Sequence, residues 1–282
     1  VRLRIGRYVI RQCPHCLLAW TCGIEMEPGA FYDKAYFVGT DANAPKGYDD
    51  YFSLATAMER THAQRLRRLR RLVPAARTLL DVGCGPGFFV RAASDAGLDA
   101  RGLEVSAFAA QYGRDRLGQD VVTGPIDAAS LAQAGGPFDL ITLWDAIEHL
   151  PAPDEALQLL AARLRPDGIL ALSTGDIGSL AARACGRRWH LFNLPEHLWF
   201  FTVPSLSHVL RRAGLDVVRV EREIGWYTLQ YLFDRLLHSL GRAPIRLPAA
   251  VFNRLAVPVS LFDIVTVYAR KSVPREGSAL PS

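Results

Sequence analysis

The stretch that decides the fold covers residues 78–89 and reads Thr78-Leu79-Leu80-Asp81-Val82-Gly83-Cys84-Gly85-Pro86-Gly87-Phe88-Phe89. Its first residues are mainly apolar, which is typical of a buried strand. The three glycines that follow predict a tight turn, because glycine has no Cβ and lets the backbone come close to a ligand. Pro86 then marks the start of a helix. We therefore predict a strand, a turn that can hold a ligand, and a helix.

The spacing of the glycines argues against one class of nucleotide-binding enzyme. The turn has the pattern Gly83-x-Gly85-x-Gly87, whereas turns that bind dinucleotides have the pattern G-x-G-x-x-G. Pro86 also lacks the backbone N–H with which the start of a helix binds pyrophosphate. The sequence therefore does not indicate a nicotinamide-dependent dehydrogenase.

Short apolar runs alternate with helical stretches from residue 78 to about residue 220, which is typical of an α/β sheet with crossover helices. Ser106 can cap one helix, and Pro153 followed by two acidic residues can begin another. Residues 165–168 read Arg-Pro-Asp-Gly and predict a turn. The predicted strands cover residues 78–82, 100–104, 121–123, 138–143, 169–174 and 217–220, with a last strand at 262–268.

Four motifs in this order resemble those of the class I S-adenosylmethionine-dependent methyltransferases. The first is Asp-x-Gly-x-Gly-x-Gly at residues 81–87, and the second is Glu104 at the end of the next strand. The third is a Phe-Asp strand followed by Glu-His-Leu, at residues 138–150. The fourth is the turn at 164–168, in which an aspartate replaces the family's first glycine. The resemblance covers about residues 50–270.

The resemblance implies the fold and the cofactor. The fold would be α/β, a Rossmann-like seven-stranded methyltransferase sheet, mostly parallel with a reversed last strand and helices on both faces. The cofactor would be S-adenosylmethionine, bound at the carboxyl ends of the strands. A carboxylate can accept hydrogen bonds from both ribose hydroxyls, so Glu104 suits that role. The implied cofactor-binding residues are Asp81, Gly83 and Gly85 around the amino-acid moiety with Gly87 in the same turn, Glu104 at the ribose, Val105 and Ile126 at the adenine, and Trp144 and Asp145 closing the site.

The candidate catalytic residues are Glu148, His149 and His197. Methyl transfer to a hydroxyl needs a positioned acceptor and a base, for which His149 is the candidate, although Glu148 and His149 can instead brace the site. A second interpretation adds Asp145 to these three to form a divalent-metal site that lowers a hydroxyl pKa. It resembles the Glu-x-x-Glu-His motif with a distant histidine in ubiquinone-type and small-RNA O-methyltransferases, with aspartate replacing the first glutamate. No metal ligand is assigned.

The N-terminal extension, residues 1–49, contains Cys-Pro-His-Cys at residues 13–16, which resembles the second knuckle of a zinc ribbon. A structural zinc site normally takes four protein ligands. Cys22 offers a third ligand, and no clear fourth follows. We therefore expect an incomplete N-terminus whose cysteines are not needed for methyl transfer, and assign no zinc.

The methyltransferase domain is placed at residues 50–271. Residues 58–72 predict an amphipathic helix with Leu66 and Leu69 on its apolar stripe and arginines on a solvated face. Within the domain we expect an aromatic flap at 179–203 that roofs the acceptor pocket. The remaining predicted segments are a helical lid at 226–261 and a flexible tail at 272–282.

Composition limits the class of protein. The chain has 282 residues, 50% of them hydrophobic, with 33 basic and 28 acidic residues for a net charge of +5. No apolar run reaches the length of a membrane span, and the N-terminus lacks the apolar core of a signal peptide. Five cysteines do not form a disulfide framework, so we expect a reducing, cytoplasmic setting.

The sequence leaves three functions open. The first is O-methylation of a small-molecule, sugar or lipid- or quinone-like acceptor. The second is methylation of RNA, against which stands the lack of an RNA-binding module. The third is a scaffold of the same fold that binds the cofactor without catalysis. Contact of the C-terminal helices with a membrane surface is an alternative to packing on the core. No feature of the sequence indicates the oligomeric state.

Overall fold

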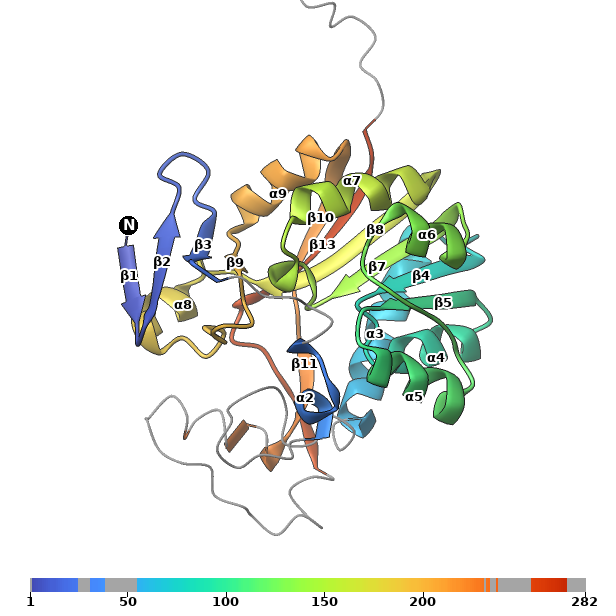
Figure 1. Ribbon diagram of the computed structural model, residues 1–282, viewed down its shortest axis with the longest axis horizontal. Helices are drawn as coiled ribbons and strands as arrows, with labels where there is room; N and C mark the ends of the chain where they lie inside the picture. Colours follow the sequence, from blue (N-terminus) through green and yellow to red (C-terminus); the bar gives the residue numbers. More distant parts are fainter. Residues whose placement is uncertain are drawn as a thin grey trace, which may run out of the picture.

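A seven-stranded sheet organises the chain in the computed structural model (Figure 1). The structure describes residues 2–24, 31–38, 55–230, 232–233, 237 and 255–272. The strands are β4 (Thr78–Val82), β5 (Asp99–Glu104), β6 (Asp120–Thr123), β7 (Phe138–Trp144), β8 (Leu164–Gly175), β10 (Leu215–Arg222) and β13 (Ile264–Lys271). Their order is β10-β13-β8-β7-β4-β5-β6, with β13 antiparallel to both neighbours. The predicted sheet with a reversed last strand is confirmed.

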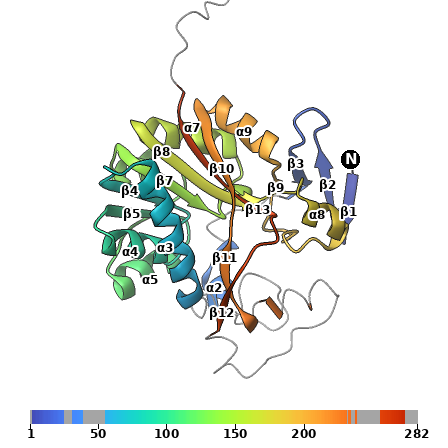
Figure 2. The ribbon, with the colours of Figure 1, turned by 180° about the vertical axis from the view of Figure 1, so that it is seen from behind.

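Helices cover both faces of the sheet (Figures 1 and 2). Neighbouring strand residues point to opposite faces, so Leu79 and Leu80 belong to two different apolar cores. No helix in the described part of the chain combines the length and apolar character needed to span a membrane. One face carries α3 (Ala55–Leu72), α4 (Phe88–Asp95) and α5 (Ala107–Leu117), and the other carries α6 (Ala128–Ala134), α7 (Pro153–Arg163) and α9 (Val203–Arg212).

The helices begin where local signals predict. The Ser106 side chain accepts a hydrogen bond from the backbone N–H of Ala109 at 3.3 Å and caps α5. α7 has Pro153 in its first turn, followed by two acidic side chains that interact favourably with the helix dipole. Gly87 precedes α4 with φ of +83°, a conformation that glycine adopts without strain.

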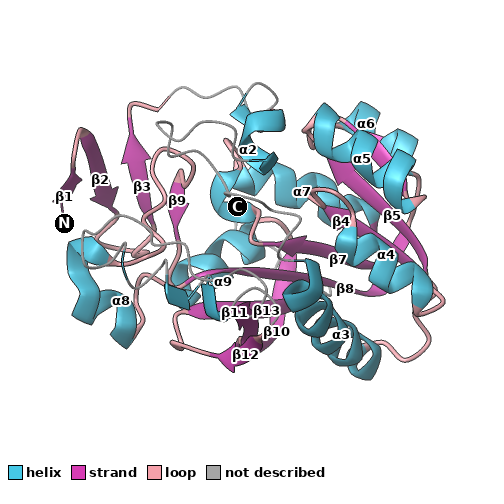
Figure 3. Cartoon of the chain, turned by 90° about the horizontal axis from the view of Figure 1, so that it is seen from below, coloured by secondary structure: helices cyan, strands magenta, loops and turns pink. Residues whose placement is uncertain are grey.

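A second sheet combines the N-terminal segment with the flap. It consists of β1 (Arg2–Ile5), β2 (Tyr8–Gln12), β3 (Ala19–Cys22) and β9 (Trp199–Phe200), in that order and antiparallel throughout. The flap contributes α8 (Leu180–Cys185) and the short 3₁₀ helix η3 (Gly186–Arg188), which lie beside β1 and β2 (Figure 3). Ile10 and Ala19 share an apolar core with Ala182, Trp189 and Phe200. The N-terminal segment and the flap therefore pack as one unit.

Two local predictions differ from the structure. Residues 165–168, predicted as a turn, lie inside β8, where the register with β7 shifts so that this short stretch bulges from the ladder. The ends of the predicted helical lid are instead β11 (Gly225–Thr228) and β12 (Ala256–Val259), which pair antiparallel. Between them, residues 229–230, 232–233 and 237 are helical, as predicted. The lid prediction at 231, 234–236 and 238–254 and the tail at 273–282 lie outside the described residues.

Glycine in the middle of β5 avoids overpacking, because a Cβ at Gly102 would lie 2.5 Å from Sγ of Cys84. We expect Gly102→Ala to lower the free energy of unfolding by about 1–3 kcal/mol through overpacking. In a Cys84→Ala background the same substitution should cost clearly less, since the sulfur is gone. Urea denaturation of the four proteins measures both effects, and an equal cost in the two backgrounds would contradict this explanation.

Candidate active site

The candidate site lies at the carboxyl ends of β4, β5 and β7, where the glycine turn at residues 83–87 leaves the sheet. The backbone N–H groups of Gly83 and Cys84 donate to the carbonyl of Leu103, at 2.8 and 3.4 Å, and so fix the turn against β5. Gly83 is exposed, with φ of +68°, and a Cβ there would lie 3.0 Å from Cβ of Ala146. The turn therefore presents bare backbone to the space above the sheet.

Asp81 is buried directly below this turn. Its carboxylate accepts a hydrogen bond from Oγ1 of Thr142 on β7 at 2.7 Å. Burial raises the pKa of Asp81 to about 7, and the hydrogen bond from Thr142 opposes that shift. Asp81 therefore joins β4 to β7 at the floor of the site.

Glu104 ends β5 and also faces the turn. One carboxylate oxygen accepts from the backbone N–H of Gly85 at 2.7 Å, and the other accepts from the N–H of Ser106 at 2.8 Å. Burial raises the pKa of Glu104, whereas these two hydrogen bonds lower it. Each carboxylate oxygen accepts about two hydrogen bonds, so both oxygens keep a site for a vicinal diol. The bare glycine turn and this acceptor pair fit S-adenosylmethionine.

Val105 and Ile126 follow neighbouring parallel strands, β5 and β6, and both are half-buried. The backbone N–H of Gly124 donates to the carbonyl of Glu104 at 2.9 Å and ties the loop after β6 to the end of β5. Ile126 packs against the main apolar core from the edge of that loop. Val105 thus follows Glu104 directly, the loop that carries Ile126 is tied to Glu104, and the adenine assignment stays a prediction.

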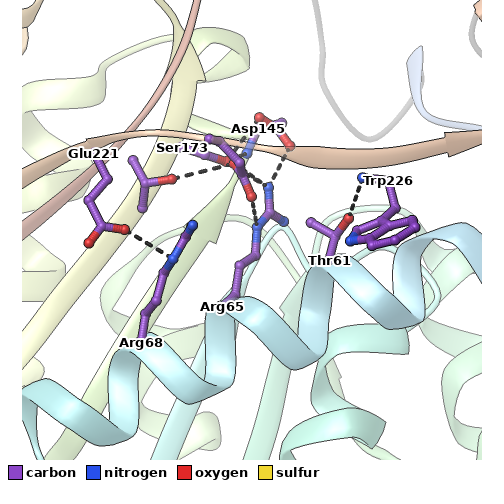
Figure 4. A network of polar contacts seen from close by, with 9 residues as sticks. Thr61, Arg65, Arg68, Asp145, Ser173, Glu221 and Trp226 are labelled. Carbon is purple, nitrogen blue, oxygen red and sulfur yellow. Dashed lines mark hydrogen bonds and ion pairs between the residues drawn. The ribbon is translucent and has the colours of Figure 1, made fainter. Parts of the chain in front are cut away.

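Trp144 and Asp145 both contact a buried arginine, Arg65, for which the sequence predicted a solvated face. Figure 4 shows Arg65 with Asp145 and Ser173. Arg65 on α3 is 6% exposed, and its guanidinium lies 4.2 Å from the centre of the Trp144 ring. It donates twice to Glu223, at 2.7 and 2.9 Å, and lies 3.4 Å from Asp145. The solvated-face prediction is therefore wrong for Arg65.

The arginine network fixes the loop after β7. Asp145 has φ of +52°, a strained conformation for a residue with a side chain. Its carboxylate accepts from Oγ of Ser173 at 2.9 Å, and its backbone N–H donates to the same hydroxyl at 3.0 Å. The spacing of Arg65 and Leu69, one helical turn apart, was the signal that Arg65 shares the buried stripe.

Glu148, His149 and His197 come together as the sequence predicts. Each offers a ligand atom, and these atoms all lie within 4.8 Å of one another. The two imidazole rings meet edge to face with centres 4.7 Å apart. The backbone N–H of Leu198 donates to the carbonyl of Glu148 at 2.9 Å, which fixes the flap strand against the short 3₁₀ helix η2 (Ile147–His149). Asp145 is not part of this group, because its carboxylate contacts Arg65 and Ser173.

The surroundings of His149 set its tautomer. Its Nδ1 lies 3.0 Å from the backbone carbonyl of Glu196, which can only accept, so Nδ1 carries the proton in this contact. Nε2 then keeps its lone pair. Burial lowers the pKa of His149 to about 4, so the ring is neutral near pH 7. A neutral imidazole with a free Nε2 can act as a base or as a metal ligand.

Glu148 has the opposite shift. Burial raises the pKa of Glu148 to about 8, and the charge of Asp145 adds to the effect. Its Oε2 atom is buried without a hydrogen-bond partner among the described residues. An unpartnered buried carboxyl oxygen is costly, so this atom is poised to contact a cation or a donor supplied by a ligand.

Tyr32 and Tyr36 are site residues that the sequence analysis missed. The Tyr32 hydroxyl lies 2.9 Å from Nδ1 of His149, and the Tyr36 hydroxyl donates to Glu196 at 3.3 Å. Burial raises the pKa of Tyr32, and the charges of Glu196, Glu148 and Glu104 raise it further. Tyr32 precedes α2 (Lys34–Val38), and Tyr36 lies in it. The dense run of aromatic residues at 31–37 was the feature of the sequence that could have indicated both.

The flap reaches the site through His197 rather than through its large aromatic residues. Trp189 is 3% exposed, and its indole N–H donates to Asp263 at 2.8 Å. Phe192 and Phe200 pack with Trp189 in the core beneath the N-terminal sheet. Trp199 donates to the carbonyl of Leu150 at 2.8 Å. Trp189 and Phe200 therefore pack in the core of the N-terminal sheet, and the roofing of the acceptor pocket by the flap stays a prediction.

Comparison with known proteins adds a family and several relatives. The family described as a methyltransferase domain matches residues 54–220. The ubiquinone biosynthesis O-methyltransferase of Cupriavidus pinatubonensis is 28% identical over 156 residues, 52% of this chain and 63% of that protein. The one from Methylococcus capsulatus is 30% identical over 190 residues, 62% of this chain and 79% of that protein. The mitochondrial one from Arabidopsis thaliana is 30% identical over 171 residues, 57% of this chain and 52% of that protein.

The chain thus spans less than two thirds of the Cupriavidus and Arabidopsis proteins. Among solved structures, the CcbJ methyltransferase from Streptomyces caelestis is similar with a TM-score of 0.53 and 13% identity, covering 88% of this chain and 100% of that chain. Magnesium protoporphyrin IX methyltransferase from Synechocystis PCC 6803 with bound SAH has a TM-score of 0.51 and 15% identity, covering 82% and 90%. At these identities the likeness shows the fold alone.

Glu148 should make stability depend on pH. Because its pKa is raised from 4.5 to about 8 on folding, its favourable contribution is complete below pH 4.5 and is lost as the pH rises through 8. Glutamine stays neutral at all of these pH values. The free energy of unfolding of Glu148→Gln should therefore rise relative to that of wild type as the pH increases from 4.5 to 8. Denaturant titrations with chelator present measure this, with exposed Glu155→Gln as the control. A constant difference across the range would contradict a buried carboxyl with a raised pKa.

Proposed function

The chain belongs to the methyltransferase domain family of class I S-adenosylmethionine-dependent enzymes, and we propose that it transfers a methyl group to a hydroxyl of a small molecule. The observation that carries this proposal is the cluster of Glu148, His149 and His197 beside the glycine turn. S-adenosylmethionine supplies an activated methyl group when bound. The chain's own residues then have to orient the acceptor and remove its proton.

His149 is the proposed base. Its Nδ1 proton is held by the carbonyl of Glu196, so Nε2 is the atom that takes the proton of the acceptor hydroxyl. The resulting imidazolium lies beside the carboxyl group of Glu148. Tyr32 contacts His149, and Tyr36 donates to Glu196 beside the cluster, which supports a role for both tyrosines at the site.

The proposed acceptor is a ring hydroxyl of a quinol-like aromatic compound. The support is twofold: the curated relatives are named as ubiquinone biosynthesis O-methyltransferases, and rings gather at the base, where Tyr32 and His197 meet His149 edge to face. Aromatic groups pair well in such arrangements. Hydroxyls of sugars or lipids are the alternative acceptors. All five cysteines are unpaired, which supports the proposal of a reducing, cytoplasmic setting.

A divalent cation is a second way for the same cluster to work. Glu148, His149 and His197 offer one carboxylate and two imidazole ligands, and the unpartnered Oε2 of Glu148 suits a cation. Carboxylate and imidazole together suit first-row divalent ions, which lower the pKa of a bound hydroxyl. In this version His149 serves as a ligand instead of a base.

Cofactor binding should depend on Glu104. We expect Glu104→Gln to weaken binding of S-adenosylhomocysteine by about 10–100-fold, because hydrogen bonds to a charged group are lost. Isothermal titration calorimetry measures the affinity, and thermal unfolding checks that the turn at Gly85 survives. Glu155→Gln, on the exposed first turn of α7, is the control of equal charge change. Wild-type affinity in the Glu104 variant would reject the assignment.

Turnover should depend on His149. With a catechol as acceptor and labelled S-adenosylmethionine, His149→Ala should lower kcat by about 10²–10⁴ while leaving cofactor affinity near wild type. Mass spectrometry of the methylated product measures the rate. Full activity in that variant would reject the residue's role.

The base and metal versions separate in the same assay. Loss of activity with a chelator, regained with magnesium in wild type and not in His197→Ala, identifies a metal site. Activity that the chelator does not change supports the version in which His149 is the base.

A further inference from the structure

The two segments that build the N-terminal sheet and its neighbours carry positive charge only. Residues 2–24 contain four arginines and residues 177–195 contain three, and neither segment contains a lysine or an acidic residue. The positive charges of these seven arginines exceed the net charge of +5 of the whole chain. Acidic residues therefore outnumber basic ones in the rest of the sequence. Because β1 and β2 lie beside α8 and η3 (Figures 1 and 3), these segments form one basic lobe.

Three of these arginines line one cavity of about 330 Å³. They come from three elements: Arg4 from β1, Arg11 from β2 and Arg187 from η3. Arg4 is paired with Val9 across the β1–β2 ladder, and Arg11 is two residues further along β2, so these three side chains share one face. None of the three arginines forms an ion pair within the part of the chain that the structure describes.

Guanidinium groups that line one cavity without a carboxylate repel one another, and an anion bound between them relieves the repulsion. The planar guanidinium donates paired hydrogen bonds that match phosphate oxygens, which lysine cannot do. Val9 gives the cavity an apolar wall for the atoms that carry the phosphate. We propose that this cavity binds the phosphate or diphosphate group of a ligand.

The cavity favours a compact phosphate group over a nucleic acid strand. Binding of single strands uses exposed aromatic rings on which bases stack. The exposed large apolar side chains of the basic lobe are Leu17 and Leu180, and no aromatic one is among them in the described residues. A soluble phosphate ester and a phospholipid headgroup offer the same chemistry, and the experiment has to distinguish them.

The cavity is separate from the methyl-transfer site but is joined to it through the sheet. β3, the neighbour of β2, pairs with β9, and Oγ1 of Thr21 on β3 donates to the backbone carbonyl of His197 at 3.0 Å. Arg187 lies in the flap that leads to His197. A ligand bound by its phosphate therefore contacts the two segments that hold His197 in place.

Calorimetric titration of the full chain with inorganic pyrophosphate tests the proposal. We expect one saturable site per chain, weakened about tenfold or more by each of Arg4→Gln, Arg11→Gln and Arg187→Gln. Arg183→Gln is the matched control, because it removes the same charge from α8 outside the cavity, and it should change the affinity less than about twofold. Retained binding of S-adenosylhomocysteine shows that each variant is folded and keeps this test independent of the proposed acceptor.

Vesicle sedimentation then identifies the source of the phosphate. Binding to phosphatidylcholine vesicles that contain phosphatidic acid, lost in the same three variants, supports the cavity with a lipid headgroup as its ligand. Pyrophosphate binding without vesicle binding supports it with a soluble ligand. The proposal is overturned if the chain binds neither pyrophosphate nor the vesicles, or if Arg183→Gln loses as much affinity as the three cavity variants. Tight binding of a single-stranded oligonucleotide through all seven arginines also overturns it.

Discussion

The close approach of three backbone segments to the glycine turn is the constraint on which the site depends. A Cβ would lie 2.5 Å from Cys84 at Gly102, 2.9 Å from the carbonyl of Pro86 at Gly113 and 3.0 Å from Ala146 at Gly83. β5, α5 and the loop after β7 therefore all press against the turn. This packing brings Glu104 within hydrogen-bond distance of Gly85 and fixes where a diol can be held. A side chain at any of these glycines would require the neighbouring atoms to shift.

Buried charge is the second property that shapes the site. Asp81, Glu104 and Glu148 are all buried, and burial raises the pKa of each. Among the described lysine and arginine residues, only Arg65 is buried. Glu223 accepts two of its hydrogen bonds. The site is thus acidic and little solvated, which suits a ligand that carries positive charge, such as a sulfonium or a divalent cation. A product without that charge gains less from the same surroundings, which favours its release.

The sequence predicts what local chemistry determines. The strand, turn and helix at 78–89 follow from apolar residues and glycines within a few positions, and Ser106 and Pro153 begin helices by contacts inside one turn. The contacts that it missed join distant residues: Arg65 with Glu223, Tyr32 with His149, and Trp189 with Asp263 are 158, 117 and 74 residues apart. Each of these side chains is ambiguous in a sequence, because an arginine or an aromatic residue on an amphipathic stretch can face solvent or core. Only the tertiary partner decides which.

The N-terminal sheet is a structural component of the candidate site. The backbone of the flap is fixed on both sides there: the N–H of Leu198 donates to the carbonyl of Glu148, and its carbonyl accepts from the N–H of Thr21 at 2.9 Å. The next residues, Trp199 and Phe200, pair with β3. His197 is therefore held between the loop after β7 and the sheet that carries the basic lobe. In the described structure no residue of β3 forms a hydrogen bond or ion pair with the side chain of Glu148 or His149. The register of β3 with β9 nevertheless sets how far His197 reaches toward both of them.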